Sequence, residues 1–70
     1  MSPRLSPTAE FREAWVLRKA RAIDYARLLG CPRTQLGRWM CAAQIAATPQ
    51  TVERLTMLAL LLGYRGSLWR

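Results

Sequence analysis

The sequence predicts an all-α protein, a compact domain of four to five helices, and three features of the chain support this class. Apolar residues recur at three- and four-residue spacing, as they do along one side of an amphipathic helix. Two pairs, Ser6–Pro7 and Thr48–Pro49, have the hydroxyl-then-proline order typical of helix starts. Glycines at Gly30 and Gly63 follow two of the apolar segments, where helices commonly end.

Length and charge restrict the class of partner. The chain has 70 residues, with 11 Lys or Arg against 4 Asp or Glu, so its net charge at pH 7 is +7. A chain this short forms one small core and buries only about 60% of its unfolded surface. We therefore expect low stability as a monomer, or support from a partner. The positive charge favours a polyanion, nucleic acid before an anionic membrane, and the alternative is a merely soluble basic domain.

Several functions are not expected from this composition. The chain has no His and only 2 Cys, fewer than the four ligands of a structural zinc site, so we expect no metal and no cofactor. Cys31 and Cys41 lie at opposite ends of one predicted helix, roughly 15 Å apart, which is too far for a disulfide. No nucleophile stands beside a base, and we expect no enzyme. Free cysteines are in keeping with a reducing cytoplasm.

Targeting and membrane segments are also not expected. No apolar run follows Met1–Arg4, so we expect no signal peptide. The longest apolar run, Met57–Leu62, is far too short to span a bilayer. We expect a protein of the cytoplasm that does not enter a membrane.

The first part of the chain divides into an arm and a helix. Residues 1–5 are expected to form a flexible N-terminal arm, and the first helix to start at Ser6–Pro7. Its predicted inward positions follow three- and four-residue spacing. They are Phe11, Ala14, Trp15 and Leu17 or Arg18. Of Trp15 and Val16, one is expected at the surface or against a partner, the alternative being a tryptophan in the core.

Two short helices are predicted within Ala22–Met40, at about 23–29 and 33–40, on either side of Gly30–Cys31–Pro32. The predicted apolar positions before and after this hinge follow helical spacing. They are Ile23, Tyr25, Ala26, Leu28, Leu29, Leu36 and Trp39. Gly37 stands in mid-helix on the outward side, where the missing side chain permits close approach to another molecule but costs about 1 kcal/mol of helix stability.

The rest of the chain holds a connection, a fourth helix and a tail. Ile45 is expected to fold back over the core from the connection. The last helix is predicted at about 49–62, and residues 63–70 form a tail. One side of this helix carries Val52, Leu55, Thr56, Ala59 and Leu62, and the opposite side is apolar as well. A chain of this size cannot cover both sides, which favours a symmetric dimer.

The segment Ala22–Met40 resembles the helix-turn-helix of the Cro/repressor-like (XRE-type) DNA-binding proteins. The small residue Ala26 and the turn glycine Gly30 carry the resemblance, with the apolar positions Tyr25, Leu29, Cys31, Leu36 and Trp39. It is clear over residues 11–39 and looser up to 62. The runs Arg-Leu-Leu-Gly and Leu-Gly-Arg-Trp are most similar to small phage and mobile-element regulators. The resemblance implies a repressor-like domain at 6–62, in a cytoplasmic protein encoded by a bacterium or phage.

The resemblance also implies a mode of DNA binding, with the helix at about 33–40 in the major groove. The expected base-reading residues are Arg33, Thr34, Arg38 and the flanking Gln35. The alternative for both arginines is contact with phosphates. The expected contacts to the DNA backbone are Lys19, Arg21, Gln44 and Thr48. The chain lacks the glycine, hydroxyl cap and glutamine that the family usually has before the second helix, so Arg21 is expected to replace the usual phosphate contact.

The function that the resemblance implies is a dimeric transcriptional repressor of a palindromic operator, acting on its own operon. Such regulators accompany phage genes, including anti-CRISPR operons, and toxin–antitoxin pairs. No small-molecule ligand is expected. The expected dimer contacts are Met57, Leu58, Leu61, Tyr64, Leu68 and Trp69; the alternative for the tail is packing on its own subunit, or disorder. The alternative function is an antitoxin-like or partner-binding module that uses the helix at 49–62. A membrane-surface peptide is a weak third, because basic and apolar residues do not segregate on one helix.

Overall fold

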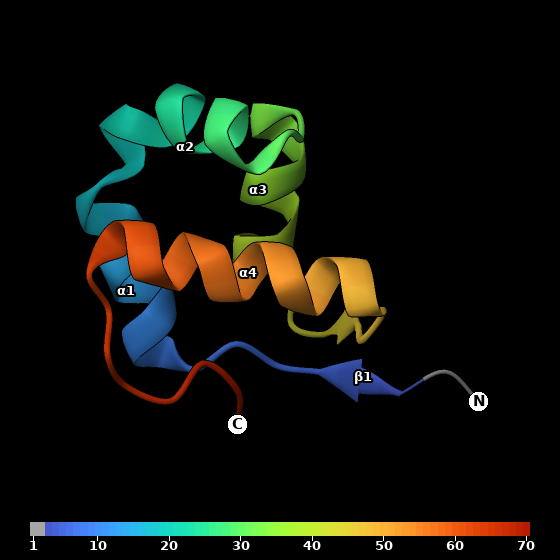
Figure 1. Ribbon diagram of the computed structural model, residues 1–70. Helices are drawn as coiled ribbons and strands as arrows, with labels where there is room; N and C mark the ends of the chain where they lie inside the picture. The colour runs from blue at the N-terminus through green and yellow to red at the C-terminus, as the bar shows by residue number, and fades with distance from the viewer. Residues whose placement is uncertain (1–2) are drawn as a thin grey trace.

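Four α-helices, one turn of 3-10 helix and a two-stranded sheet make up residues 3–70, which are the residues that the computed structural model describes (Figure 1). Their order is β1 (Arg4–Leu5), α1 (Ala9–Leu17), η1 (Lys19–Arg21), α2 (Ala22–Leu29), α3 (Arg33–Cys41), β2 (Ile45–Ala46) and α4 (Pro49–Leu62). The prediction of a small, mainly helical domain is confirmed, whereas a purely α-helical class is not, because of the sheet.

The first helix begins later than predicted. Thr8 is its N-cap, and the Thr8 hydroxyl accepts a hydrogen bond of 3.2 Å from the backbone N–H of Phe11. The predicted start at Ser6–Pro7 is therefore wrong. Pro7 is fully buried and forms an isolated β-bridge with Trp69, so this pair is extended chain rather than the first helical turn.

The predicted hinge joins α2 to α3. Gly30 ends α2 in the left-handed region, with φ 74°, and the backbone N–H of Cys31 donates to the carbonyl of Ala26 at 3.1 Å. Pro32 is the N-cap of α3, with φ −65° and ψ 146°. This short, fixed turn sets α3 against α2.

The two glycines of this segment are expected to respond to alanine in opposite directions. Gly30→Ala should lower the free energy of unfolding by about 1 kcal/mol, because a Cβ is unfavourable at positive φ. Gly37→Ala should raise it by up to about 1 kcal/mol, because Gly37 is helical and a Cβ there meets no atom within 4 Å. Urea unfolding followed by circular dichroism measures both changes. Equal effects of the two variants would contradict this account of the hinge.

The N-terminal segment is not a free arm over its described part. Arg4 and Leu5 pair antiparallel with Ala46 and Ile45, and the N–H of Ala47 donates to the carbonyl of Pro3 at 3.0 Å. The expectation of a flexible arm at 1–5 therefore differs from the structure at residues 3–5, while Met1 and Ser2 lie outside the described residues.

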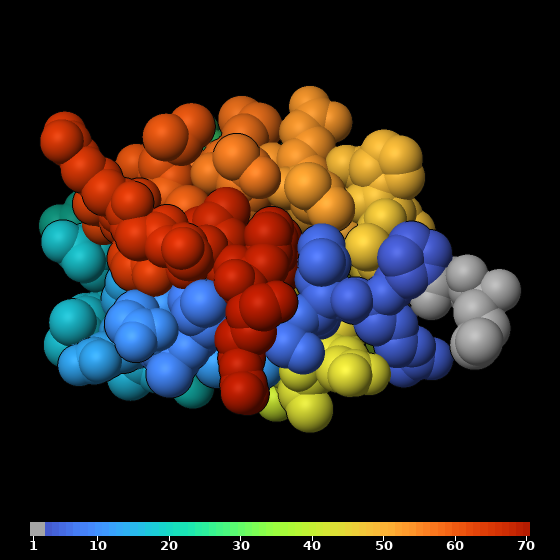
Figure 2. All heavy atoms as spheres, turned by 90° about the horizontal axis from the view of Figure 1, so that it is seen from below, coloured from blue at the N-terminus to red at the C-terminus, as the bar shows by residue number. Residues whose placement is uncertain are grey.

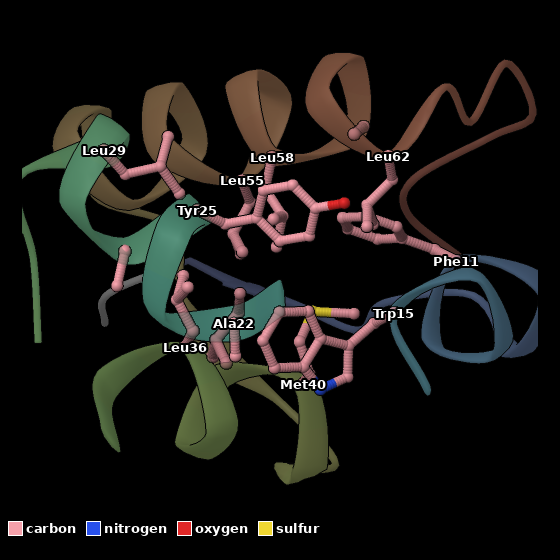
Figure 3. Packing of buried hydrophobic residues seen from close by; sticks show 13 residues of the cluster. Phe11, Trp15, Ala22, Tyr25, Leu29, Leu36, Met40, Leu55, Leu58 and Leu62 are labelled. Carbon is pink, nitrogen blue, oxygen red and sulfur yellow. The ribbon is translucent and has the colours of Figure 1, made fainter. Parts of the chain in front are cut away.

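The core lies between α4 and the other three helices, and Figure 3 shows its side chains converging from all four. Phe11, Leu36, Leu55 and Leu58 are fully buried, and Ile45 covers the core as predicted. Three predicted inward positions are wrong, since they are exposed. They are Leu17 (74%), Ile23 (49%) and Leu28 (66%). Of the pair at the end of α1, Trp15 is in the core and Val16 is at the surface.

The C-terminal tail packs on its own chain. It runs past the start of α1, beside the N-terminal segment (Figure 2). The ring of Tyr64 stacks on Phe11 with centroids 5.5 Å apart, and Trp69 meets Phe11 edge-on at 6.4 Å. The N–H of Thr8 donates to the carbonyl of Leu68, and that of Arg70 to Ser6. Packing on its own subunit, one of the two alternatives for the tail, therefore describes this structure.

Among the residues expected at a dimer interface, Leu58 is misplaced, because it is fully buried in the core of its own chain. Tyr64, Leu68 and Trp69 are half-buried against that core. Only Met57 and Leu61 of the expected set remain exposed. No helix within residues 3–70 combines the length and the apolar character needed to cross a membrane.

Candidate nucleic-acid interface

The outward side of α3 is the candidate site. Leu36 and Met40 bury the opposite side of the helix in the core. Because an α-helix turns about 100° per residue, Arg38 lies directly away from these two side chains, with Thr34 one turn before it. Arg38 and Thr34 are both exposed. The helix thus presents a guanidinium and a hydroxyl to solvent from a rigidly packed element.

Arg33 points to a different side of α3. Together with Thr34 and Gly37 it lines one wall of a cleft of about 220 Å³. The other wall comes from the end of α1 and from the segment that leads into α2. These lining residues are Trp15, Lys19 and Ala22. The structure therefore brings Lys19 and Arg33 to one cleft, although they are far apart in the sequence.

The charged side chains that line the cleft are all cationic. The six residues that line the cleft include two cations and no carboxylate. Arg21, the last residue of η1, is exposed next to the start of α2. No side-chain hydrogen bond caps α2, which follows directly after η1. Cationic side chains thus border α3 on the side of its N-terminus.

The other predicted contacts lie apart from this cleft. Gln35 is half-buried on the flank of α3. Gln44 and Thr48 follow the C-terminal end of α3, whereas the cleft is at its N-terminal end. The Thr48 hydroxyl caps α4 by accepting from the N–H of Thr51 at 3.2 Å and donates to the Thr51 hydroxyl at 2.8 Å. Its side chain is therefore already engaged within the chain.

Two residues of the cleft, Trp15 and Ala22, were not among the predicted site residues. Trp15 was expected either in the core or at the surface, and it is 3% exposed yet lines the cleft. No pattern in the sequence places it there, because its position depends on how η1 turns the chain. Gly37 was singled out as a point of close approach, and it does line the cleft.

Comparisons of this chain with protein-family models, with curated proteins and with solved structures give no match. The resemblance to the repressor-like family, which depends on the residues of one segment, stays a prediction. What can be proposed about function therefore depends on the geometry and chemistry of the residues themselves.

Proposed function

We propose that this protein is a sequence-specific regulator of transcription that binds double-stranded DNA with α3 in the major groove. The observation that carries the proposal is the placement of Arg38 and Thr34. They project from a helix whose opposite side is fixed in the core, so the side of α3 that carries them is set before binding. The net charge of +7 supplies the general attraction to DNA.

The proposed contacts follow from the chemistry of each side chain. Arginine pairs with the N7 and O6 of guanine through two parallel hydrogen bonds, which suits Arg38 to read a base. Thr34 offers a hydroxyl and a methyl group to the adjacent position. Lys19 and Arg21, which flank the helix, are suited to phosphates and position the protein without reading sequence. As the simplest regulation, the protein represses its own operon by occupying its operator.

The experiment that tests the proposal is a titration of DNA from upstream of the gene, compared with random duplex, at two salt concentrations. We expect one site to be bound more tightly than random DNA, with the ratio largely kept as salt rises, because base contacts depend less on counterion release than phosphate contacts do. Equal, salt-sensitive binding to every duplex would reject sequence reading.

A homodimer is part of the proposal. Met57, Leu60 and Leu61 expose large apolar side chains on one side of α4, and a two-fold arrangement would bury them against a second copy. We expect Met57→Glu with Leu60→Glu to shift sedimentation equilibrium toward the monomer by at least about tenfold in dissociation constant, since it places charges in an apolar contact. Leu17→Glu, at an exposed position of α1, is the matched control. A wild-type protein that sediments as a monomer would reject the dimer.

The same apolar side of α4 favours a second candidate function, a module that binds a different protein, as an antitoxin does. This alternative makes no use of the arginines of α3. It predicts that an Arg33→Ala/Arg38→Ala variant keeps its biological activity, whereas Met57→Glu with Leu60→Glu loses it. If the protein is a DNA-binding regulator, the Arg33→Ala/Arg38→Ala variant should instead lose its biological activity.

A further inference from the structure

The cleft between α3 and the end of α1 holds an unpaired hydrogen-bond donor. Trp15 is almost completely buried, and its indole nitrogen makes no hydrogen bond with the residues of the described chain. No fully buried side-chain nitrogen or oxygen among those residues lacks a partner. The indole nitrogen therefore keeps some access to solvent, and Trp15 meets solvent at the cleft that it lines. Figure 3 shows this nitrogen on the side of the ring away from Tyr25 and toward α3.

The other polar side chains of the cleft are donors as well. Lys19 offers an ammonium group and Arg33 a guanidinium group, both without any acceptor capacity. No carboxylate lines the cleft. Arg33 is the first residue of α3, and the N-terminus of this helix carries a partial positive charge. An anion with several oxygen atoms can accept from all of these donors at once, whereas a cation cannot.

The shape of the cleft fits such a group. Its volume of about 220 Å³ holds a phosphate with its first waters. Gly37 forms part of the wall, and a Cβ built there meets no atom within 4 Å, so the backbone of α3 is open to the cleft at this point. A side chain longer than alanine at this position would enter the space.

We propose that this cleft binds a phosphate group, with Lys19 and Arg33 as its ionic partners and the indole N–H of Trp15 as a directed donor. The inference rests on the proposed function for the source of the phosphate, which is a phosphodiester of the DNA backbone. It assigns Arg33 to the backbone and leaves base reading to Arg38 and Thr34. Free phosphate shares the same chemistry and is the other possible source.

The first arm of the test uses inorganic phosphate and the free protein. In proton–nitrogen NMR spectra, the indole N–H signal of Trp15 should shift on titration with phosphate at constant ionic strength, with chloride as the reference salt. The signals of Trp39 and Trp69 serve as internal controls. Lys19→Gln should weaken the phosphate affinity by about threefold to tenfold, as expected for loss of one charge-assisted contact, whereas Arg18→Gln, an exposed neighbour outside the cleft, should not.

The second arm separates the two sources of phosphate. A random-sequence duplex should shift the same Trp15 signal, and free phosphate should compete with it. Gly37→Leu should abolish the shift in both arms by filling the cleft, while Gly37→Ala should keep it. Because both variants leave the core unchanged, far-ultraviolet circular dichroism checks that each is folded.

The outcomes distinguish the cleft from the proposed function. A shift with phosphate in a protein that binds no duplex supports the cleft and rejects DNA as its source, and with it the regulator. Tight DNA binding that leaves the Trp15 signal unmoved overturns the cleft and leaves the regulator standing. The cleft is also overturned if the shift persists in Gly37→Leu, or if neither phosphate nor DNA produces one.

Discussion

Arg38→Ala is expected to weaken binding to the specific site by about 1–3 kcal/mol, roughly fivefold to 150-fold, with little effect on random DNA. Arg38 is exposed at the centre of the outward side of α3, opposite the buried Leu36 and Met40. In the proposed complex, the fixed helix directs the guanidinium toward a base edge, so the substitution is expected to remove two hydrogen bonds at one base pair. Fluorescence anisotropy with labelled duplexes measures the change.

The controls for Arg38 test whether charge alone is responsible. Arg65→Ala removes the same charge from an exposed position in the tail and should change the affinity for either DNA only slightly. Arg33→Ala should instead weaken specific and random DNA alike and reduce the salt slope by about one, as expected for a phosphate contact. The assignment would be contradicted if Arg38→Ala and Arg65→Ala had the same effect.

The helix boundaries show which parts of the fold are encoded locally. α4 has the predicted bounds, because Thr48–Pro49 caps its start and Gly63 ends it in the left-handed region, with φ 73°. Both devices act within a few residues of the helix ends. The same reasoning failed at Ser6–Pro7, because these residues pair with Trp69 and Arg70 at the far end of the chain. From the sequence alone, a Ser–Pro pair that begins a helix cannot be distinguished from one that is extended and pairs with a distant segment.

The candidate site, like the helix boundaries, could be predicted only in part from the sequence. The outward residues of α3 followed from helical spacing, since Leu36 fixes which side of the helix faces the core. The cleft did not follow, because it depends on how the 3-10 turn at η1 places Lys19 on the same cleft as Arg33. Ile23 and Leu28 were placed in the core because they are apolar, although only part of the circumference of α2 contacts other helices.

Phe11→Ala is expected to bring the protein close to its unfolding midpoint at 25 °C. Removing a fully buried phenylalanine costs about 3–5 kcal/mol, and small domains sit at the low end of the stability range of about 5–15 kcal/mol. Phe11 also stacks on Tyr64 and meets Trp69 edge-on, so its loss weakens the packing of the tail on α1. Urea unfolding followed by tryptophan fluorescence and by circular dichroism measures the loss.

Two control variants test whether this effect comes from the central position of Phe11 or from shortening any apolar side chain. Leu17→Ala, on the exposed side of the same helix, should change the free energy of unfolding by less than about 0.5 kcal/mol. Phe11→Leu should remain folded but lose the aromatic pairs, worth about 0.5–1.5 kcal/mol beyond the area buried. A Phe11→Ala protein that unfolds at the same urea concentration as Leu17→Ala would mean that the tail and α1 do not share the core described here. The tail would then be free to contact a second copy, as the sequence alone had suggested for Tyr64, Leu68 and Trp69.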